Sequence, residues 1–287
     1  MTTPAYFTRT GETFTPLPIA ASLWSADQMH GVAVSGLLAK GIESALEGLG
    51  REGMVPARYR IDLFRAARML PTHIVTTVVR EGPRLVLIDG EVRQGDTVVA
   101  RGSATFLATG EQPAGVAWES TERSAPPPLD LVPVSDEMRT PYFESLKPWS
   151  TDFAEHTNGG RHATWQSPVP TVAGESMSPF VMVAAVADTT SMITNWSDAG
   201  IEWINADVSV AISRLPVSLE VGIRATDHVS SEGIAAGTAE LFDRAGTFGT
   251  STVTALANAR RTVKFEEQPH HVADAGFGDD ATQSSIA

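Results

Sequence analysis

The chain has 287 residues, of which 42% are hydrophobic, and its formal net charge is −13. This length suits two ordinary domains or one large one, and the hydrophobic fraction is enough for a core. The acidic balance argues against binding of the whole chain to nucleic acid or an anionic membrane. The absence of cysteine excludes disulfides, a thiolate nucleophile and cysteine-ligated metals.

The N-terminal segment carries no targeting signal that we can identify. Residues 1–18 lack a basic region followed by a long apolar run, so no signal peptide is predicted. No stretch of the sequence approaches the length of a membrane span. We therefore expect a cytoplasmic protein without a membrane span.

The first part of the chain predicts one helix followed by strands. Residues 1–20 are rich in Thr and Pro, with Phe7 and Phe14 suited to a short leading strand. Apolar residues at helical spacing predict a helix over 32–46, and glycines end it. Alternating and β-branched patterns then predict strands at 57–69, 73–81, 85–93 and 97–107, with a hairpin turn at 94–96.

The middle of the chain differs in character from both ends. Residues 111–159 contain a stiff Pro-rich run and charged stretches, which predicts a linker across the surface. Tyr142, Phe143 and Trp149 are its candidate anchor points. The sequence thus predicts an N-terminal unit at 1–110 and a C-terminal unit at 160–264, followed by a disordered tail at 265–287.

The C-terminal unit repeats the order of strand, helix and strands. A strand is predicted at 162–169, and Ser178 and Pro179 are a typical N-cap and first residue of a helix that runs to Trp196. Further strands are predicted at 202–212, 217–226, 231–242 and 247–258.

Asp188 is the most unusual residue of this predicted helix. It lies on the apolar face, four residues after Ala184. An uncompensated buried carboxylate costs roughly several kcal/mol, so this position favours a catalytic or binding role. The alternative is a residue at the helix edge, bonded to Thr189 or Thr190 and facing water.

The two units also share an internal repeat. Asp62 leads to Leu70–Pro71 at the same offset at which Asp207 leads to Leu215–Pro216. Each unit also has a turn that precedes a Thr-led strand. These matches predict a duplicated unit of one helix and an antiparallel sheet.

This repeated unit resembles the hotdog fold, and the whole chain resembles the TesB-like acyl-CoA thioesterase II family. The resemblance rests on Met29-His30-Gly31 at the first helix, Val186-Ala187-Asp188 in the second, the strand segment 204–216, and Ser251-Thr252-Val253-Thr254. It covers about residues 20–110 and 160–262. It implies an α+β double hotdog: two tandem repeats, each with a long helix wrapped by an antiparallel sheet.

The resemblance also implies a catalytic site. In this family a helix Asp, a hydroxyl residue on the next strand and a Gln on the last strand hold the attacking water. These positions fall on Asp188, Asn205 and Thr254, so the acid is kept and both helpers differ in type. Asn205 shares a strand face with Asp207, away from the helix-packed side, which suits a water-holding role only if the strand bulges there.

Substrate-binding residues are expected in the first unit. The amides of His30 and Gly31, at a helix start, are candidate donors to the thioester oxygen. In many single-hotdog enzymes the acid follows nine residues later, where this chain has Ala39; Glu43, one turn further on, is a weaker substitute. Arg60 and Arg65, in a cluster with Arg58 and Arg68, could bind the nucleotide of coenzyme A or form a solvated strand face.

The sequence therefore predicts an acyl-CoA thioesterase of fatty acid metabolism that hydrolyses acyl-CoA through a water activated by Asp188. We expect no cofactor and no metal, because His270 and His271 lack further ligands. A homo-oligomer, a dimer of double hotdogs, is expected. The alternatives are a hotdog enoyl-CoA hydratase or dehydratase, for which His30 is the only candidate base, and a catalytically inactive acyl-CoA-binding protein.

Overall fold

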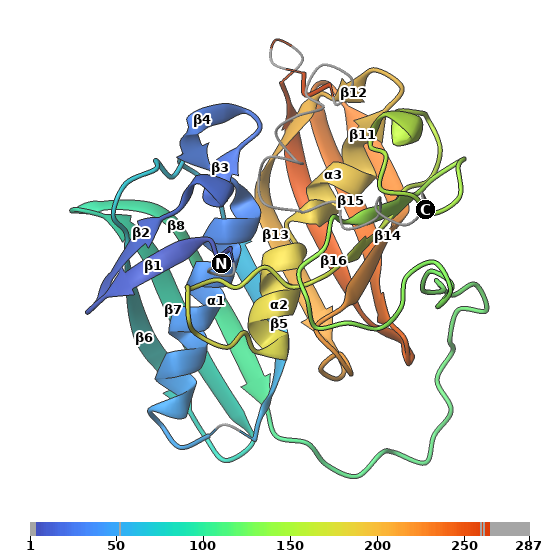
Figure 1. Ribbon diagram of the computed structural model, residues 1–287. Coiled ribbons are helices and arrows are strands. Elements are labelled where there is room, and N and C mark those ends of the chain that lie inside the picture. Colours follow the sequence, from blue (N-terminus) through green and yellow to red (C-terminus); the bar gives the residue numbers. More distant parts are fainter. Residues whose placement is uncertain (1–3, 52, 259, 261, 265–287) are drawn as a thin grey trace, which may run out of the picture.

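One large antiparallel sheet forms the body of the molecule. A computed structural model describes residues 4–51, 53–258, 260 and 262–264. In this part of the chain ten strands join in the order β6-β7-β8-β5-β13-β16-β15-β14-β10-β9 (Figure 1). Their bounds are β5 (Val55–Asp62), β6 (His73–Glu81), β7 (Leu85–Gln94), β8 (Thr97–Leu107), β9 (Tyr142–Glu144), β10 (Ala163–Gln166), β13 (Trp203–Ile212), β14 (Val221–Ser231), β15 (Ile234–Asp243) and β16 (Gly246–Ala257).

Short elements surround this sheet. They are β1 (Phe7–Thr10), β2 (Thr13–Pro16), β3 (Ala21–Ser22), β4 (Ser25–Met29), β11 (Trp196–Ser197), β12 (Gly200–Ile201) and the 3-10 turns η1 (Pro18–Ala20) and η2 (Ala154–His156). The β1–β2 hairpin places Phe7 and Phe14 in strands, and both side chains are buried. Phe7 also forms a parallel bridge with Val172, so the start of the chain is joined to its second half.

The first predicted helix is confirmed as α1 (Gly31–Glu47). His30 caps its N-terminus, and its apolar face is buried against β6, β7 and β8. The buried positions recur at helical spacing, as the sequence pattern requires: Val34, Leu37, Leu38, Ile42 and Leu46.

The second predicted helix is broken into two. α2 (Pro179–Val186) begins at the expected Ser178 cap, and α3 (Thr189–Asn195) follows after a turn at 187–188. Across this turn the amides of Asp188, Thr190 and Ser191 each bond to the carbonyl three residues earlier, where an α-helix bonds four earlier. The Thr189 hydroxyl also donates to the Val186 carbonyl at 2.7 Å. The expectation of one long helix in each half therefore holds only for the first half.

α1 and α2 pack side by side on the same face of the sheet (Figure 1). A Cβ on Gly36 would lie 3.1 Å from the Ala185 methyl, so the two backbones approach closely there. The Ser35 hydroxyl donates to the Ala184 carbonyl at 2.6 Å, which joins the two helices by a buried hydrogen bond. This packing brings the N-terminus of α1 toward the break between α2 and α3.

The two halves of the sheet meet where β5 pairs with β13. The register places Asp62 directly opposite Asp207, the two residues that the sequence repeat matched. The strand predicted at 57–69 is shorter than expected, because β5 ends at Asp62. The Leu63 amide donates to the Ala206 carbonyl at 2.7 Å, and the exposed residues 64–66 then leave the sheet.

The segment predicted as a linker contacts the second half of the chain through its aromatic residues. Phe143 lies in β9 and is buried with Trp196 and Ile201. Tyr142 and Trp149 pack against the buried cluster of Val132, Trp165 and Phe242. The predicted disordered tail and His270–His271 lie outside the described residues.

Candidate active site

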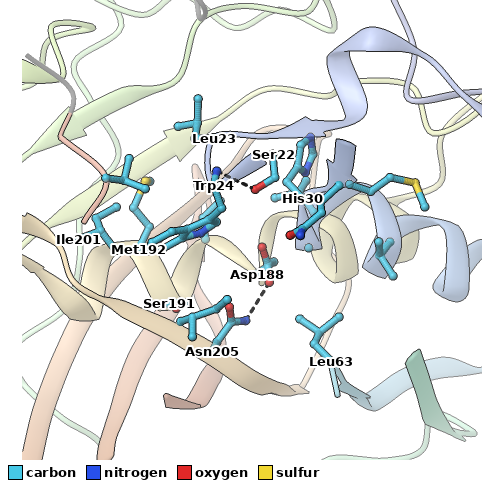
Figure 2. A pocket seen from close by; sticks show the side chains of 18 of the residues that line it. Ser22, Leu23, Trp24, His30, Leu63, Asp188, Ser191, Met192, Ile201 and Asn205 are labelled. Atoms are coloured by element: carbon cyan, nitrogen blue, oxygen red, sulfur yellow. Dashed lines mark hydrogen bonds between the residues drawn. The ribbon is translucent and has the colours of Figure 1, made fainter. Parts of the chain in front are cut away.

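A cavity of about 400 Å³ lies between the two halves of the molecule. Residues from the start of α1, the α2–α3 break, β13 and the linker line it. Figure 2 shows Asp188 and Asn205 near its centre, with apolar side chains on one side. The apolar residues that line the cavity include Trp24, Phe143, Phe153, Met192 and Ile201. An apolar cavity with a few polar groups is typical of a ligand site.

Asp188 points from the α2–α3 break onto the N-terminus of α1. Its carboxylate accepts a hydrogen bond from the Val32 amide, in the first turn of that helix. A Cβ on Gly31 would lie 2.2 Å from Asp188 Oδ1, so only glycine leaves room for the carboxylate. The helix N-terminus favours negative charge, which helps to hold the acid in this position.

The environment of Asp188 makes it a stronger base than an ordinary aspartate. Burial raises the pKa of its carboxyl to about 6, while hydrogen bonds from Asn205 and the Val32 amide act in the opposite direction. A carboxylate with a pKa near 6 is ionised at neutral pH and still has appreciable basicity. This is the property that a general base requires.

Asn205 reaches Asp188 because β13 bulges. The register of β13 against β16 shifts between Asn205 and Asp207, which is the bulge that the sequence interpretation required. Asn205 Nδ2 consequently donates to Asp188 Oδ1 at 2.9 Å (Figure 2). The amide therefore fixes the orientation of the carboxylate.

Thr254 is not brought to this site. Its hydroxyl and its amide both donate to Asp207 on the exposed side of the sheet, and it does not line the cavity. The residue of β16 that lies directly opposite Asn205 is Ala255, which is buried and carries no polar side chain. Because the strand bulges, Asn205 and Asp207 no longer share a face, so the partner of Asp207 cannot contact Asp188.

His30 has a structural role in the described geometry. Its Nδ1 accepts from the Ala33 amide at 3.1 Å, so Nε2 carries the proton and donates to the Ile19 carbonyl at 3.1 Å. Burial lowers the pKa of its imidazole to about 4, so the ring is neutral. Its own amide donates to the Ala20 carbonyl, which removes it as a donor for substrate.

The Gly31 amide remains as a donor at the start of α1. In the first turn the Val32 amide binds Asp188, and the Ala33 amide binds the His30 ring. Within the described part of the chain, the Gly31 amide donates to no protein group, and Gly31 lines the cavity. Of the two predicted amide donors, therefore, the geometry leaves only Gly31 available.

The two predicted arginines lie in different places. Arg60 pairs with Asp62 at 2.6 Å on the exposed face of β5 and does not line the cavity. Arg65 lies at the exposed rim of the cavity. No described carboxylate lies within ion-pair distance of Arg65.

Sequence reasoning missed two hydroxyl groups in the cavity wall. Ser191 follows Asp188 by three residues, and its amide donates to the Asp188 carbonyl at 3.1 Å. Figure 2 shows Ser191 beside Asn205. Its helical spacing from Asp188 was a usable signal. Tyr6 also lines the cavity, but it lies far from Asp188 in sequence and no local pattern indicates it.

The described residues contain neither a metal-binding cluster nor a membrane-spanning helix. Residues 4–51, 53–258, 260 and 262–264 contain no group of three or more His, Asp or Glu side chains that could hold a metal ion. None of the helices described above is long and apolar enough to cross a membrane.

Comparison with known families gives two matches that are consecutive along the chain. The acyl-CoA thioesterase N-terminal domain matches residues 20–107, and the acyl-CoA thioesterase C-terminal domain matches residues 120–257. Together they cover most of the chain. No curated protein matches it.

Several solved structures share the fold at low sequence identity. The tesB protein of Mycobacterium avium subs paratuberculosis is 16% identical with a TM-score of 0.62, covering 88% of this chain and 95% of that one. TesB2, an acyl-CoA thioesterase II of Mycobacterium marinum, is 13% identical with a TM-score of 0.58, covering 87% and 93%. A hot dog fold protein of unknown function from Alicyclobacillus acidocaldarius is 16% identical with a TM-score of 0.61, covering 88% and 95%.

Proposed function

Because this chain belongs to the acyl-CoA thioesterase family of thioester hydrolases, we propose that it hydrolyses acyl-CoA to a free fatty acid and coenzyme A, with Asp188 as the general base. The observation that carries this proposal is the Asp188 carboxylate, held by Asn205 and the Val32 amide in an apolar cavity. We also infer that each half of the sheet, with its helices, is one hotdog unit.

The proposed reaction needs one water and one donor for the carbonyl oxygen. Asp188 removes a proton from the water as its oxygen attacks the thioester carbon, and negative charge moves onto the carbonyl oxygen. The Gly31 amide donates to that oxygen from the start of α1. When the intermediate collapses, the carbon–sulfur bond breaks and the thiolate leaves; the proton held by Asp188 returns to the sulfur.

The polar groups around Asp188 have separate tasks in this proposal. Asn205 donates one N–H to Asp188, so its task is to orient the base. The Ser191 hydroxyl makes no hydrogen bond within the described residues and lines the cavity beside Asn205, so it is the group that we assign to the water. A hydroxyl on the neighbouring helix would thereby replace the helper expected on the last strand.

The substrate would lie with its two ends in different surroundings. The aromatic and aliphatic residues of the cavity, among them Trp24, Phe143 and Met192, would surround the acyl chain. Arg65, at the rim and without an ion-pair partner among the described residues, would meet the phosphates of coenzyme A. Arg60, paired with Asp62, is not needed in this arrangement.

The hydratase alternative finds no support in the geometry of His30. That chemistry requires a histidine with a nitrogen free for the substrate, and both ring nitrogens of His30 are bound to backbone groups. A catalytically inactive acyl-CoA-binding protein is the stronger alternative, because neither Ala255 nor Thr254 provides a water-binding side chain from the last strand.

A thiol-release assay across acyl-CoA chain lengths tests the proposed function. Release of free coenzyme A supports hydrolysis. Tight acyl-CoA binding without release would identify a binding protein. Loss of enoyl-CoA absorbance without thiol release would identify a hydratase.

The pH dependence of turnover is expected to follow Asp188. Only the ionised carboxylate can accept a proton, and its pKa is about 6. The kcat value should therefore fall tenfold per pH unit below about 6 and reach a plateau above it. Steady-state rates between pH 4.5 and 8, with the melting temperature as a check on folding, measure this. A plateau that extends down to pH 4.5 would contradict the assignment.

Replacing Asn205 with Ala should change both the pKa and the orientation of the base. The hydrogen bond from Asn205 lowers the pKa of Asp188, so its loss should move the acid limb of the rate profile to higher pH. The carboxylate also loses its orientation, and we expect kcat above the limb to fall by about tenfold. Thr254→Val is the matched control and should leave both quantities unchanged, because Thr254 contacts Asp207 outside the cavity. An unmoved limb in Asn205→Ala would contradict this role.

A further inference from the structure

Tyr6 is fixed between the two halves of the molecule beside the start of α1. Its amide donates to the Pro170 carbonyl at 3.0 Å, and its carbonyl accepts from the Leu17 amide at 2.8 Å. Its ring packs edge-on against the His30 ring, with 5.1 Å between centroids. His30 precedes Gly31, so the Tyr6 ring lies near the start of α1, and both Tyr6 and Gly31 line the cavity.

The Tyr6 hydroxyl is open to the cavity. Only 7% of the residue is exposed, and it lines the cavity together with Asp188. The hydroxyl makes no hydrogen bond to any described residue. Its oxygen is nevertheless not fully buried, so a ligand or water can reach it. An otherwise buried residue of the cavity wall thus carries an unused donor.

The proposed reaction has a need that this donor would meet. One amide, that of Gly31, is available for the developing negative charge, and oxyanion sites are commonly built from two donors. The last strand presents the Ala255 methyl opposite Asn205 and supplies no further polar group there. A second donor would therefore come from an element other than the last strand.

We propose that the Tyr6 hydroxyl is a catalytic group that donates a hydrogen bond to the thioester oxygen opposite the Gly31 amide. This inference rests on the hydrolase function proposed above and adds a residue to its site. The phenol keeps its proton throughout, so no proton is gained or lost at Tyr6 during the reaction. It acts only by stabilising the charge that forms on the oxygen.

The surroundings of Tyr6 suit a permanent donor. Burial and the nearby Asp188 charge both raise the pKa of the phenol, so it stays protonated over the whole range in which Asp188 is ionised. Tyr59 offers a contrast. It is also buried, with its pKa raised by burial, but its hydroxyl donates to the Ser35 carbonyl at 3.0 Å and it does not line the cavity.

The test compares Tyr6→Phe with Tyr59→Phe in the full-length protein. For Tyr6→Phe we expect kcat to fall by about 10²-fold in the thiol-release assay, the loss typical of one oxyanion donor. KM should change little, because the contact strengthens only in the transition state. The acid limb should stay at about pH 6, because the base is untouched. Tyr59→Phe should keep the wild-type kcat.

Binding of a non-hydrolysable thioether analogue of acyl-CoA reports whether each variant folds its site. A Tyr6→Phe protein that binds the analogue and keeps the wild-type kcat overturns the inference, while wild-type thiol release upholds the proposed function. A shifted acid limb, or a rise in KM alone, also overturns it, because either shows a structural role. If the wild-type protein releases no thiol, the proposed function itself fails, and the role of Tyr6 fails with it.

Discussion

An Asp188→Asn protein is expected to fold, to bind acyl-CoA and to lose hydrolysis. Asn has nearly the same shape and its oxygen can still accept from the Val32 amide, so the cavity should keep its form. It cannot accept a proton from water, and loss of a general base typically costs about 10²–10⁴-fold in rate. Thiol release under saturating substrate, with analogue binding measured in parallel, is the direct test.

Although Asp188→Asn should lose turnover, its stability at neutral pH should equal or exceed that of the wild-type protein. The pKa of Asp188 is raised in the folded protein, so the unfolded chain binds fewer protons between the ordinary pKa and about pH 6. The free energy of unfolding therefore falls as pH rises through that range, and the ionised carboxylate remains a cost above it. At pH 7.5 Asp188→Asn should melt at or above the wild-type temperature. Wild-type turnover in a folded variant would exclude Asp188 as the base.

Gly31→Ala is expected to be nearly as damaging to turnover, through a purely steric cause. The added Cβ would lie 2.2 Å from Asp188 Oδ1 and 2.4 Å from its Cγ, so the carboxylate must move off the start of α1. Asp188 would lose the Val32 hydrogen bond, and a small misplacement of a catalytic group can cost about 10²-fold in rate. Overpacking of this kind also destabilises by about 1–3 kcal/mol.

A glycine at the opposite end of α1 serves as the matched control. Gly48 caps the other end of α1, and a Cβ there would meet its nearest atoms at an ordinary 3.5 Å. Gly48→Ala should therefore keep both turnover and the acid limb. If Gly31→Ala turns over acyl-CoA as fast as Gly48→Ala, the close approach of Asp188 to α1 is not required for catalysis.

The elements predicted best are those whose pattern is local. The strand at 73–81 coincides with β6, and the helix at 32–46 lies within α1. The Ser178 cap of α2 was also predicted from its own segment. These predictions succeeded because one segment carries its own periodicity and capping residues.

What the sequence could not predict depends on contacts between distant segments. At the break at 187–188 the amides bond to the carbonyl three residues earlier instead of four. The apolar pattern of the sequence does not predict this change. The bulge between Asn205 and Asp207 is defined by pairing with β16, and it decides that Asn205 reaches Asp188 while Thr254 does not. Tyr6 lines the cavity from the start of the chain, where its amide bonds to the distant Pro170 carbonyl.

The acid and the helix start that meet in the cavity come from different halves of the chain, which limits the number of sites that one chain can form. Asp188, from the second half, lies on the start of α1. At the equivalent position of the first half, Ala39 replaces the acid. Glu43 of the first half bonds to Ser178, the cap of α2, and does not line the cavity. In the proposed mechanism the described residues thus form a single reaction centre, to which both halves of the chain contribute. Because neither half alone would contain it, the expected stoichiometry is one bound substrate per chain.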